Sequence, residues 1–429
     1  MSNAVIVNGV RTAVGAFGGS LKDVAAKDLG ALVIREVLIK AGLKPALPAN
    51  AAQDAPDTAK AEGLSPIEQQ YAKWGDSVNE IAVDEVIMGN VLGSGQGQNP
   101  GRQAMIRAGL PKETTAYTIN KVCASGMKAI ALAASSIKAG DNDVVIAGGM
   151  ENMSDVPIAL PKARFGHRMD MPYGKTVDLM VFDGLYEIFY GYHMGITAEN
   201  IAARYSISRE EQDKMSLESH TRARNAIKSG LLKSEIVGVT IPQKKGDPIV
   251  FDTDERPMDT SMEKLAKLGT AFKKDGTVTA GNASGINDAA AALLIMSEDK
   301  AKAMGLQPLA RIKGYATGGV DPAYMGLGPI PAVRKLLRLT GTSIKDYGLF
   351  ELNEAFASQA IACLRELNIP WDVTNVNGSA ISIGHPIGCS GARIVLALAN
   401  EMKRRNVGLG LASLCIGGGQ GMAIAIEAV

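Results

Sequence analysis

Short runs of β-branched and other apolar residues alternate along the chain with longer Ala-rich stretches whose apolar positions recur every three or four residues. The short runs predict strands at Ala4–Val7, Glu85–Met88, Tyr117–Asn120 and Asp143–Ala147. The longer stretches predict helices at Ala25–Lys40 and along the series Met127, Ile130, Ala134 and Ile137, which Gly140-Asp141 ends. This alternation predicts a layered α/β fold with a largely parallel sheet.

The last third of the chain repeats this order. Strands are predicted at Pro308–Ile312 and Leu349–Leu352, and a helix at Ala332–Leu339. Ser125-Gly126 opens a helix in the first copy and Ser390-Gly391 in the second, while Gly148-Gly149 and Gly417-Gly418 are each taken as the end of a strand. The separations are all close to about 265 positions, which predicts two copies of one α/β unit.

Two regions lie outside this repeat. Residues 44–80 are rich in Ala, Pro, Asp and Gln with little periodicity, and they are expected to form a surface insertion or loop. Between the copies, about Ser154 to Gly285, loops alternate with a helical stretch at Arg209–Ser229. This second region is interpreted as a lid or substrate-binding domain.

Composition and charge exclude several classes of protein. The 429 residues carry 45 Lys and Arg against 44 Asp and Glu, a net charge of +1, which argues against nucleic-acid or polybasic membrane binding. The four cysteines form no CxxC pair and have no nearby His at zinc-ligand spacing, so no metal is expected. The start, MSNAVIVNGV, does not have the pattern of a signal peptide. The uncharged stretch Asn406–Ile426 breaks at Gly417–Gly419 and predicts two buried strands around a turn, so a cytoplasmic protein is expected.

A cysteine and a histidine occupy positions typical of nucleophilic chemistry. Cys123 follows a predicted strand and begins a helix, where unpaired N–H groups should lower the pKa of its thiol toward neutrality. His385 stands between Gly384 and Pro386 in a turn before a helix, and a neutral imidazole is a suitable base for a thiol. A small buried core residue and a turn-capping histidine remain the alternatives.

Two further residues end strands of the second copy. Cys415 is followed by glycines whose N–H groups can point at a ligand, although a packing turn explains the same glycines. Asn353 ends the strand one unit earlier, where it can contact a ligand or cap a helix. Because all four side chains fall where strands end or helices begin, their combination predicts covalent acyl transfer through sulfur.

Seven ordered motifs resemble the thiolase family over nearly the whole chain. They are RTAVGAFGGSL near the start, NKVCASGMKAIAL at Cys123, YGYHMG at His193, TVTAGNASGINDAAAAL at Ser284, NEAFA at Asn353, GHPIG at His385 and CIGGGQG at Cys415. The resemblance implies a five-layer αβαβα arrangement of two α/β halves with an inserted loop domain. Its implied boundaries are residues 1–154 with 286–307 for the first half, 155–285 for the loop domain and 308–429 for the second half.

The resemblance also assigns catalytic roles. Cys123 would accept the acyl group, His385 would deprotonate it and Cys415 would shuttle a second proton. Asn353 would position a water that forms one oxyanion hole together with His385, and the N–H groups of Cys123 and Gly417 would form the other. The implied reaction is the reversible condensation of two acetyl-CoA molecules to acetoacetyl-CoA and CoA.

The same resemblance implies a binding site for coenzyme A thioesters and no covalently bound cofactor. The residues implied in substrate binding are Ser284, Ala280, Gly281, His193, Met194, Met325 and Arg256. The last of these is the candidate for a CoA phosphate, and the two methionines point to short acyl groups. A homodimer or homotetramer is implied as the assembly.

Four rival functions remain to be weighed. A 3-ketoacyl-CoA thiolase of fatty-acid β-oxidation, with a broader chain-length range, is the nearest alternative. A decarboxylating ketoacyl synthase would carry a second His in place of Asn353. A dinucleotide-binding oxidoreductase would need a glycine fingerprint that GSGQGQNPG at Gly93 does not supply. A non-catalytic scaffold should have lost the two cysteines or the histidine.

The chain departs from the family at Ser379, where NGSA replaces NGGA, in the stretch 153–175 and in the long 44–80 insertion.

Overall fold

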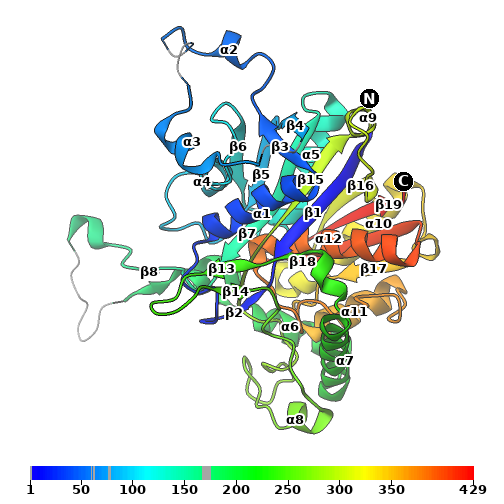
Figure 1. The fold of residues 1–429 in the computed structure, drawn as a ribbon. Helices are drawn as coiled ribbons and strands as arrows, with labels where there is room; N and C mark the ends of the chain where they lie inside the picture. Colours follow the sequence, from blue (N-terminus) through cyan, green and yellow to red (C-terminus); the bar gives the residue numbers. More distant parts are fainter. Residues whose placement is uncertain (1, 59, 61–62, 76–78, 167–174) are drawn as a thin grey trace.

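One continuous sheet runs through both halves of the chain in the computed structural model (Figure 1). The structure describes residues 2–58, 60, 63–75, 79–166 and 175–429, so parts of the expected insertion (44–80) and of the stretch 153–175 lie outside the described residues. The strand order is β17-β18-β19-β16-β1-β15-β7-β5-β6. The first half contributes β1 (Ala4–Thr12), β5 (Glu85–Gly89), β6 (Thr115–Ile119), β7 (Val144–Asn152) and β15 (Asn287–Ser297). The second half contributes β16 (Ala310–Gly319), β17 (Leu349–Leu352), β18 (Leu409–Ile416) and β19 (Gln420–Glu427).

The expectation of a largely parallel sheet was wrong, because the sheet is mixed. β5 runs parallel to β6 and β7, and β17 runs parallel to β18. The strands between them, β19, β16, β1 and β15, pair antiparallel with one another and with their outer neighbours. The alternation of strands and helices along the chain does not reveal the direction of a strand, and β19 returns antiparallel to β18 through a hairpin.

The two-copy organisation is confirmed, with one equivalence corrected. Gly148 and Gly149 do not end a strand, since β7 continues to Asn152. The start of β7 at Val144 corresponds instead to the start of β18 at Leu409, again about 265 positions apart. The strand expected at Pro308–Ile312 likewise begins at Ala310 and extends to Gly319.

Helices form three layers separated by the two halves of the sheet. The central layer contains α5 (Ser125–Ala139) and α12 (Ile387–Arg405), whose apolar residues share one core with inward-facing residues of both half-sheets. The outer layer of the first half contains α1 (Ala26–Lys40) and α4 (Pro100–Arg107), and that of the second half contains α10 (Pro329–Thr340) and α11 (Ala357–Leu367). These layers give the αβαβα order.

Glycines allow the central helices to approach each other and the sheet. A Cβ on Gly126 of α5 would lie 2.7 Å from the backbone nitrogen of Ala392 on α12, and a Cβ on Gly391 would contact Met127. A Cβ on Gly149 of β7 would overlap the carbonyl oxygen of Gly388. The repeated Ser-Gly pair of the sequence therefore marks the crossing point of two equivalent helices.

The two apolar stretches of membrane-like composition are both part of this core. Residues 406–426 form β18 and β19 around a turn at Gly417–Gly419, as predicted. Within the described residues, one helical segment, Val122–Ala139, is long and apolar enough to cross a membrane by length and composition alone. It contains α5, which packs between the half-sheets.

The 44–80 region contains more structure than the expected loop. It begins in β3 (Leu43–Ala46) and ends in β4 (Asn79–Ala82), which pair in parallel, and it contains α2 (Ala51–Asp54) and α3 (Pro66–Tyr71). The indole N–H of Trp74 donates to the carbonyl of Gly109 at 2.9 Å, and the guanidinium of Arg35 lies over the indole ring. Trp74 thus attaches the segment to the body of the protein.

The region between the halves extends below the sheet and to one side of it in Figure 1. Its helices are α6 (Met194–Arg204), α7 (Arg209–Lys228) and α8 (Met262–Ala266). Its paired strands are β8 (Ile158–Ala159) with β9 (Val177–Asp178), β10 (Tyr186–Glu187) with β11 (Tyr192–His193), and β13 (Val239–Ile241) with β14 (Ile249–Phe251). The remaining elements include β2 (Gly15–Ala16), β12 (Ile236–Val237) and α9 (Glu298–Ala303).

The contact between Gly149 and Gly388 predicts the effect of one added methyl group. Gly149→Ala should destabilise the protein by at least about 2 kcal/mol, because neither the central strand nor the start of α12 can move away. Gly408→Ala is the matched control, since a Cβ there has no described atom within 4 Å. Urea unfolding followed by circular dichroism measures both, and equal stability of the two variants would contradict this packing argument.

Candidate active site

Cys123 lies in a strained turn between β6 and α5. The hydroxyl of Ser125 accepts from the N–H of Lys121 at 2.9 Å and donates to the carbonyl of Val122 at 2.7 Å, while the side chain of Asn120 accepts from the N–H of Val122. These bonds hold Val122 at φ +47°, a conformation that a β-branched residue rarely adopts. The turn directs Cys123, 8 % exposed, into a largely apolar cavity.

The expected lowering of the Cys123 pKa was wrong. Burial raises the pKa of this thiol to about 11, which outweighs the N–H groups of Gly417 and of Cys123 itself that hydrogen-bond the sulfur and lower it. A nearby buried carboxylate, Glu151, raises it further. The helix start does supply N–H groups, but water is excluded from the sulfur, and this effect is larger.

His385 is held in a defined orientation and protonation state. Gly384, at φ +122°, lies against Asn287, whose side-chain oxygen accepts from the His385 N–H at 3.0 Å. The hydroxyl of Ser390 donates to the carbonyl of Pro386, so it accepts from His385 Nδ1 at 2.7 Å. This leaves Nε2 as the unprotonated nitrogen, and Nε2 is buried without a partner among the described residues.

Cys123 and His385 line the same cavity as a neutral pair. Burial lowers the pKa of His385 to about 3, and the buried guanidinium of Arg393 contributes. With a thiol pKa of about 11 on its partner, the empty site at pH 7 holds a thiol and an imidazole rather than an ion pair. The two groups are therefore both uncharged at pH 7 and face the same cavity.

Asn353 and Cys415 lie behind this pair and do not line the cavity. Asn353 follows β17, is fully buried, and places Nδ2 3.5 Å from His385 Nδ1, while its Oδ1 has no described hydrogen-bond partner. Cys415 is fully buried near the end of β18. Burial raises its pKa well above the ordinary value, and the proximity of Cys123 raises it further. The two sulfur atoms thus belong to one site.

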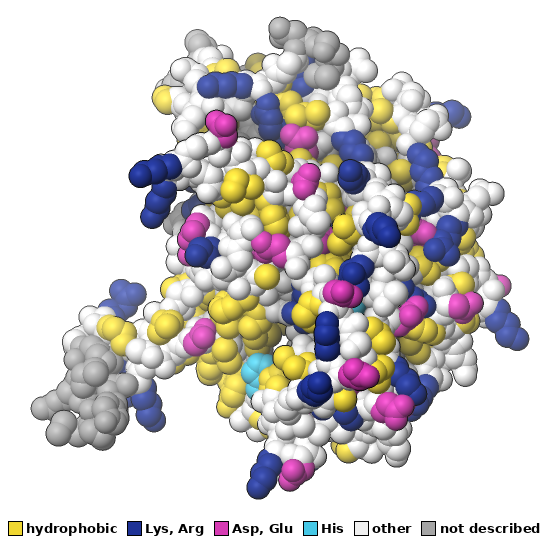
Figure 2. Space-filling model, turned by 60° about the horizontal axis from the view of Figure 1, so that its bottom comes forward, with side chains coloured by type: hydrophobic (Ala, Val, Ile, Leu, Met, Phe, Trp, Pro, Cys, Tyr) yellow, Lys and Arg dark blue, Asp and Glu magenta, His cyan; other side chains and the backbone are white. Residues whose placement is uncertain are grey.

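The cavity has a volume of about 520 Å³. Hydrophobic side chains gather around a histidine on the face that Figure 2 shows. Nine of the twelve predicted site residues line it, namely Cys123, His193, Met194, Arg256, Ala280, Ser284, Met325, His385 and Gly417. Besides Asn353 and Cys415, only Gly281 of the predicted set does not, since it faces the side chains of Leu265 and Leu268.

A cluster of aromatic and methionine side chains forms part of the cavity wall. Met194, Met325, Phe356 and Cys415 belong to one apolar cluster, and Phe272 packs against it. The ring of Phe272 stacks on His193 at 4.6 Å, and His193 Nδ1 accepts from the N–H of Gly195 at 3.0 Å. The stacking and the hydrogen bond fix the imidazole at the cavity wall.

Arg256 carries a positive charge on the cavity wall. Its Nε and Nη2 donate to the carbonyls of Ile381 and Ala283 at 2.8 and 3.0 Å, and burial lowers its pKa to about 10. In the described part of the chain no carboxylate forms an ion pair with it. An anionic part of a ligand would therefore find an uncompensated charge at this point.

Two residues that position the site were missed from the sequence. Glu151 accepts from the backbone N–H groups of Val91 and Leu92 in the first half and from that of Gly388 in the second. Burial raises its pKa to about 7. Asn287 connects the His385 turn to the carbonyl of Gly15. Each is a polar residue in an otherwise apolar strand. The sequence prediction did not use this signal, because it considered only nucleophiles and bases.

Comparison with known proteins places the chain in a family. The thiolase N-terminal domain family model matches residues 4–50 and 65–299, and the thiolase C-terminal domain model matches residues 306–428. Residues 51–64, which the N-terminal domain model does not match, lie inside the 44–80 region. An acetyl-CoA acetyltransferase of Syntrophomonas wolfei is 53% identical, with 99% of each chain covered, and that of Cupriavidus necator is 50% identical, with 100% of each covered.

A crystal structure gives the same result for the fold. The acetyl-CoA acetyltransferase of Bacillus anthracis superposes with a TM-score of 0.88 at 45% identity, covering 100% of this chain and 99% of that one. Its similarity extends over both halves and the region between them. The chain described here belongs to the thiolase family.

Proposed function

We propose that this protein is an acetyl-CoA C-acetyltransferase that condenses two acetyl-CoA molecules to acetoacetyl-CoA and CoA, and catalyses the reverse thiolysis. The full-length relatives of about 50% identity that carry this name support the assignment. The observation that carries the chemistry is the position of Cys123 in one apolar cavity with an unprotonated, unpartnered His385 Nε2. Coenzyme A thioesters are the substrates, and no covalently bound cofactor takes part.

In the first half-reaction, His385 Nε2 accepts the proton of Cys123 as the sulfur attacks the thioester carbonyl. The N–H groups of Cys123 and Gly417, which already point at the sulfur, lie where the carbonyl oxygen becomes negative. The carbon–sulfur bond to CoA breaks, and Cys415 gives its proton to the departing CoA thiolate. The products are an acetylated Cys123 and free CoA.

In the second half-reaction, the Cys415 thiolate removes an α-proton from a second acetyl-CoA. The resulting carbanion attacks the acetyl group on Cys123, and the Cys123 sulfur leaves and recovers its proton from His385. Asn353 supports this step through a water, because its buried side-chain oxygen needs a hydrogen-bond partner. That water and His385 would then stabilise the thioester oxygen of the attacking molecule.

The remaining predicted residues hold the CoA chain. Ser284 contacts the pantetheine arm, which Ala280 and Gly281 allow to approach closely, and His193 lines the acyl pocket. Met194 and Met325 confine the acyl group, while Arg256 supplies charge for a phosphate. The position of all of them except Gly281 on the wall of the cavity supports these roles.

Chain length is the test that separates this function from a broader β-oxidation thiolase. Because methionine and phenylalanine side chains form part of the cavity wall, kcat/KM for thiolysis should fall at least about tenfold from the four-carbon to the eight-carbon 3-ketoacyl-CoA. Steady-state assays with a series of purified 3-ketoacyl-CoAs measure this. A flat profile would favour the broader enzyme.

The two half-reactions should respond differently to loss of the second sulfur. Cys415→Ser should slow condensation at least about 100-fold, because a serine hydroxyl is a far weaker acid and therefore a poorer proton carrier. Transfer of the acetyl group to Cys123, followed by exchange of labelled CoA into acetyl-CoA, should fall less. Cys363→Ser is the matched control, since Cys363 is equally buried, does not line the cavity, accepts from Gln359 Nε2 and donates to the carbonyl of Gly326. Wild-type condensation by Cys415→Ser would remove Cys415 from the mechanism.

A homo-oligomer, either dimer or tetramer, and a cytoplasmic location complete the proposal. Apolar side chains on the projecting β8 arm support assembly, since Ile158 is 66 % exposed and Phe165 is 95 % exposed. Light scattering of the purified protein tests the assembly, and a monomer at micromolar concentration would contradict it. Cell fractionation tests the location.

A further inference from the structure

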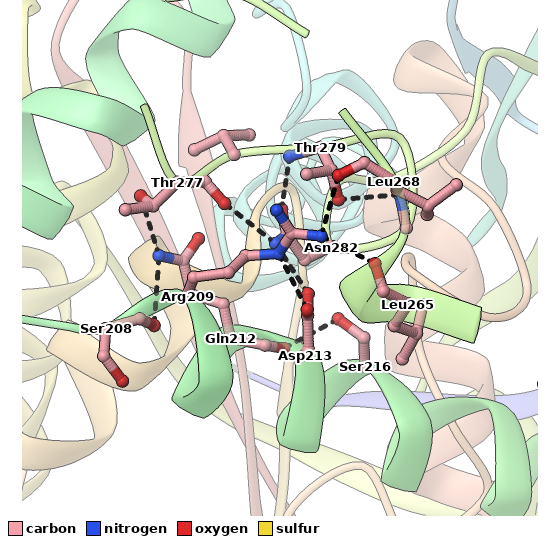
Figure 3. Close-up of polar contacts among 12 residues, drawn as sticks. Ser208, Arg209, Gln212, Asp213, Ser216, Leu265, Leu268, Thr277, Thr279 and Asn282 are labelled. Atoms are coloured by element: carbon pink, nitrogen blue, oxygen red, sulfur yellow. Dashed lines mark hydrogen bonds and ion pairs between the residues drawn. The ribbon is translucent and has the colours of Figure 1, made fainter. Parts of the chain in front are cut away.

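A partly buried ion pair at the start of α7 connects two loops that form one wall of the cavity (Figure 3). The Nε of Arg209 donates to Asp213 Oδ2 at 2.7 Å, one helical turn away, and the Asp213 side chain is only 2 % exposed. Asp213 and Arg209 do not line the cavity themselves. The remaining polar atoms of Asp213 and of Arg209 form hydrogen bonds to two different loops.

Asp213 holds the loop of residues 277–284. Its Oδ1 accepts from Asn282 Nδ2 at 3.0 Å. Asn282 in turn accepts from the N–H of Thr279 and donates to the carbonyl of Thr277, so it closes the loop upon itself. This loop supplies Ala280, Ala283 and Ser284 to the cavity wall.

Arg209 holds the second loop, residues 265–272. Its Nη2 donates to the carbonyls of Leu265 and Leu268 at 2.6 and 3.1 Å. The side chains of these two leucines lie against Gly281, where a Cβ would come within 2.7 Å of both. The same loop continues to Ala271 and Phe272, which line the cavity. Both loops are thus fixed to each other and to α7.

We infer that Arg209 and Asp213 are positioning residues that set the affinity of the cavity for the CoA chain by holding the two loops together. A guanidinium suits this task, because its planar donors bind the carboxylate and the two carbonyls at once. A neutral residue at position 213 would leave the buried guanidinium edge without its counter-charge. This inference rests on the proposed function, since CoA is the ligand it names.

The Arg209–Asp213 pair should affect the binding of CoA more than the rate of the chemical steps. Among the described residues, the hydrogen bonds that fix the Cys123 turn come from Asn120 and Ser125, and those that fix His385 come from Asn287 and Ser390. None of them involves α7. Ser284 also stays attached at its own end, because its N–H donates to the carbonyl of Ala355 at 3.0 Å.

The test compares Asp213→Asn with wild type in two measurements. Calorimetric titration with CoA should give a Kd raised about 5- to 10-fold, because the loops lose their fixed spacing. In thiolysis of acetoacetyl-CoA, KM for CoA should rise by a similar factor with kcat within about twofold. The KM for N-acetylcysteamine, a thiol that lacks most of the CoA chain, should not change.

Glu218→Gln is the matched control. Glu218 forms the same i,i+4 ion pair with Arg222 on α7, but Arg222 donates to the carbonyls of Trp371 and Thr374 instead of the two loops. Glu218→Gln should leave both the Kd and the KM for CoA unchanged. If Asp213→Asn fails to fold, Asn282→Ala carries the test, because it removes the attachment to Asp213, together with the loop's own bonds to Thr277 and Thr279, and leaves the ion pair intact.

Three results would overturn the inference. They are an unchanged Kd for CoA in the folded variants, an equal rise of KM for CoA and N-acetylcysteamine, and a fall of kcat at constant KM. Failure of the proposed function has a different signature. The wild-type protein would then bind CoA, with the expected weakening in Asp213→Asn, yet would not cleave acetoacetyl-CoA.

Discussion

The close approach of α5 and α12 at the centre of the molecule is the constraint on which the active site depends. Each helix begins just after one of the reacting groups, α5 after Cys123 and α12 after His385. Glycines at the crossing point let the two backbones touch, and Glu151 joins the start of α12 to the first half through three backbone N–H groups. A duplicated unit therefore places a nucleophile and a base at the equivalent ends of two neighbouring helices.

Burial between the two halves of the protein determines how Cys123 and His385 can react. A thiol pKa of about 11 and an imidazole pKa of about 3 mean that charge separation is unfavourable in the empty cavity. Charge develops only when a substrate carbonyl lies between the N–H groups of Cys123 and Gly417, which are oriented before it arrives. The same exclusion of water protects an acyl-cysteine from hydrolysis. An exposed, permanently ionised cysteine would lack both advantages.

The sequence predicted the site better than it predicted the sheet. Cys123, His385, Asn353 and Cys415 were identified because each falls where a strand ends or a helix begins, a local signal. Strand direction was wrong, because the antiparallel pairing of β1 with β15 and β16 joins segments that lie far apart in the chain. The pKa of Cys123 was wrong for a similar reason, since desolvation comes from both halves of the fold. Glu151 and Asp213 were missed because they bind groups far away in the chain, backbone N–H groups for Glu151 and the Asn282 side chain for Asp213.

The central claim is that His385 activates Cys123 to accept an acyl group, and mass spectrometry of the protein after brief exposure to acetyl-CoA tests it most directly. We expect one acetyl group on the peptide that contains Cys123, removed by added CoA, and at least about 100-fold slower acetylation in His385→Gln. Acetylation of a different residue, or an unchanged rate in the variant, would contradict the account.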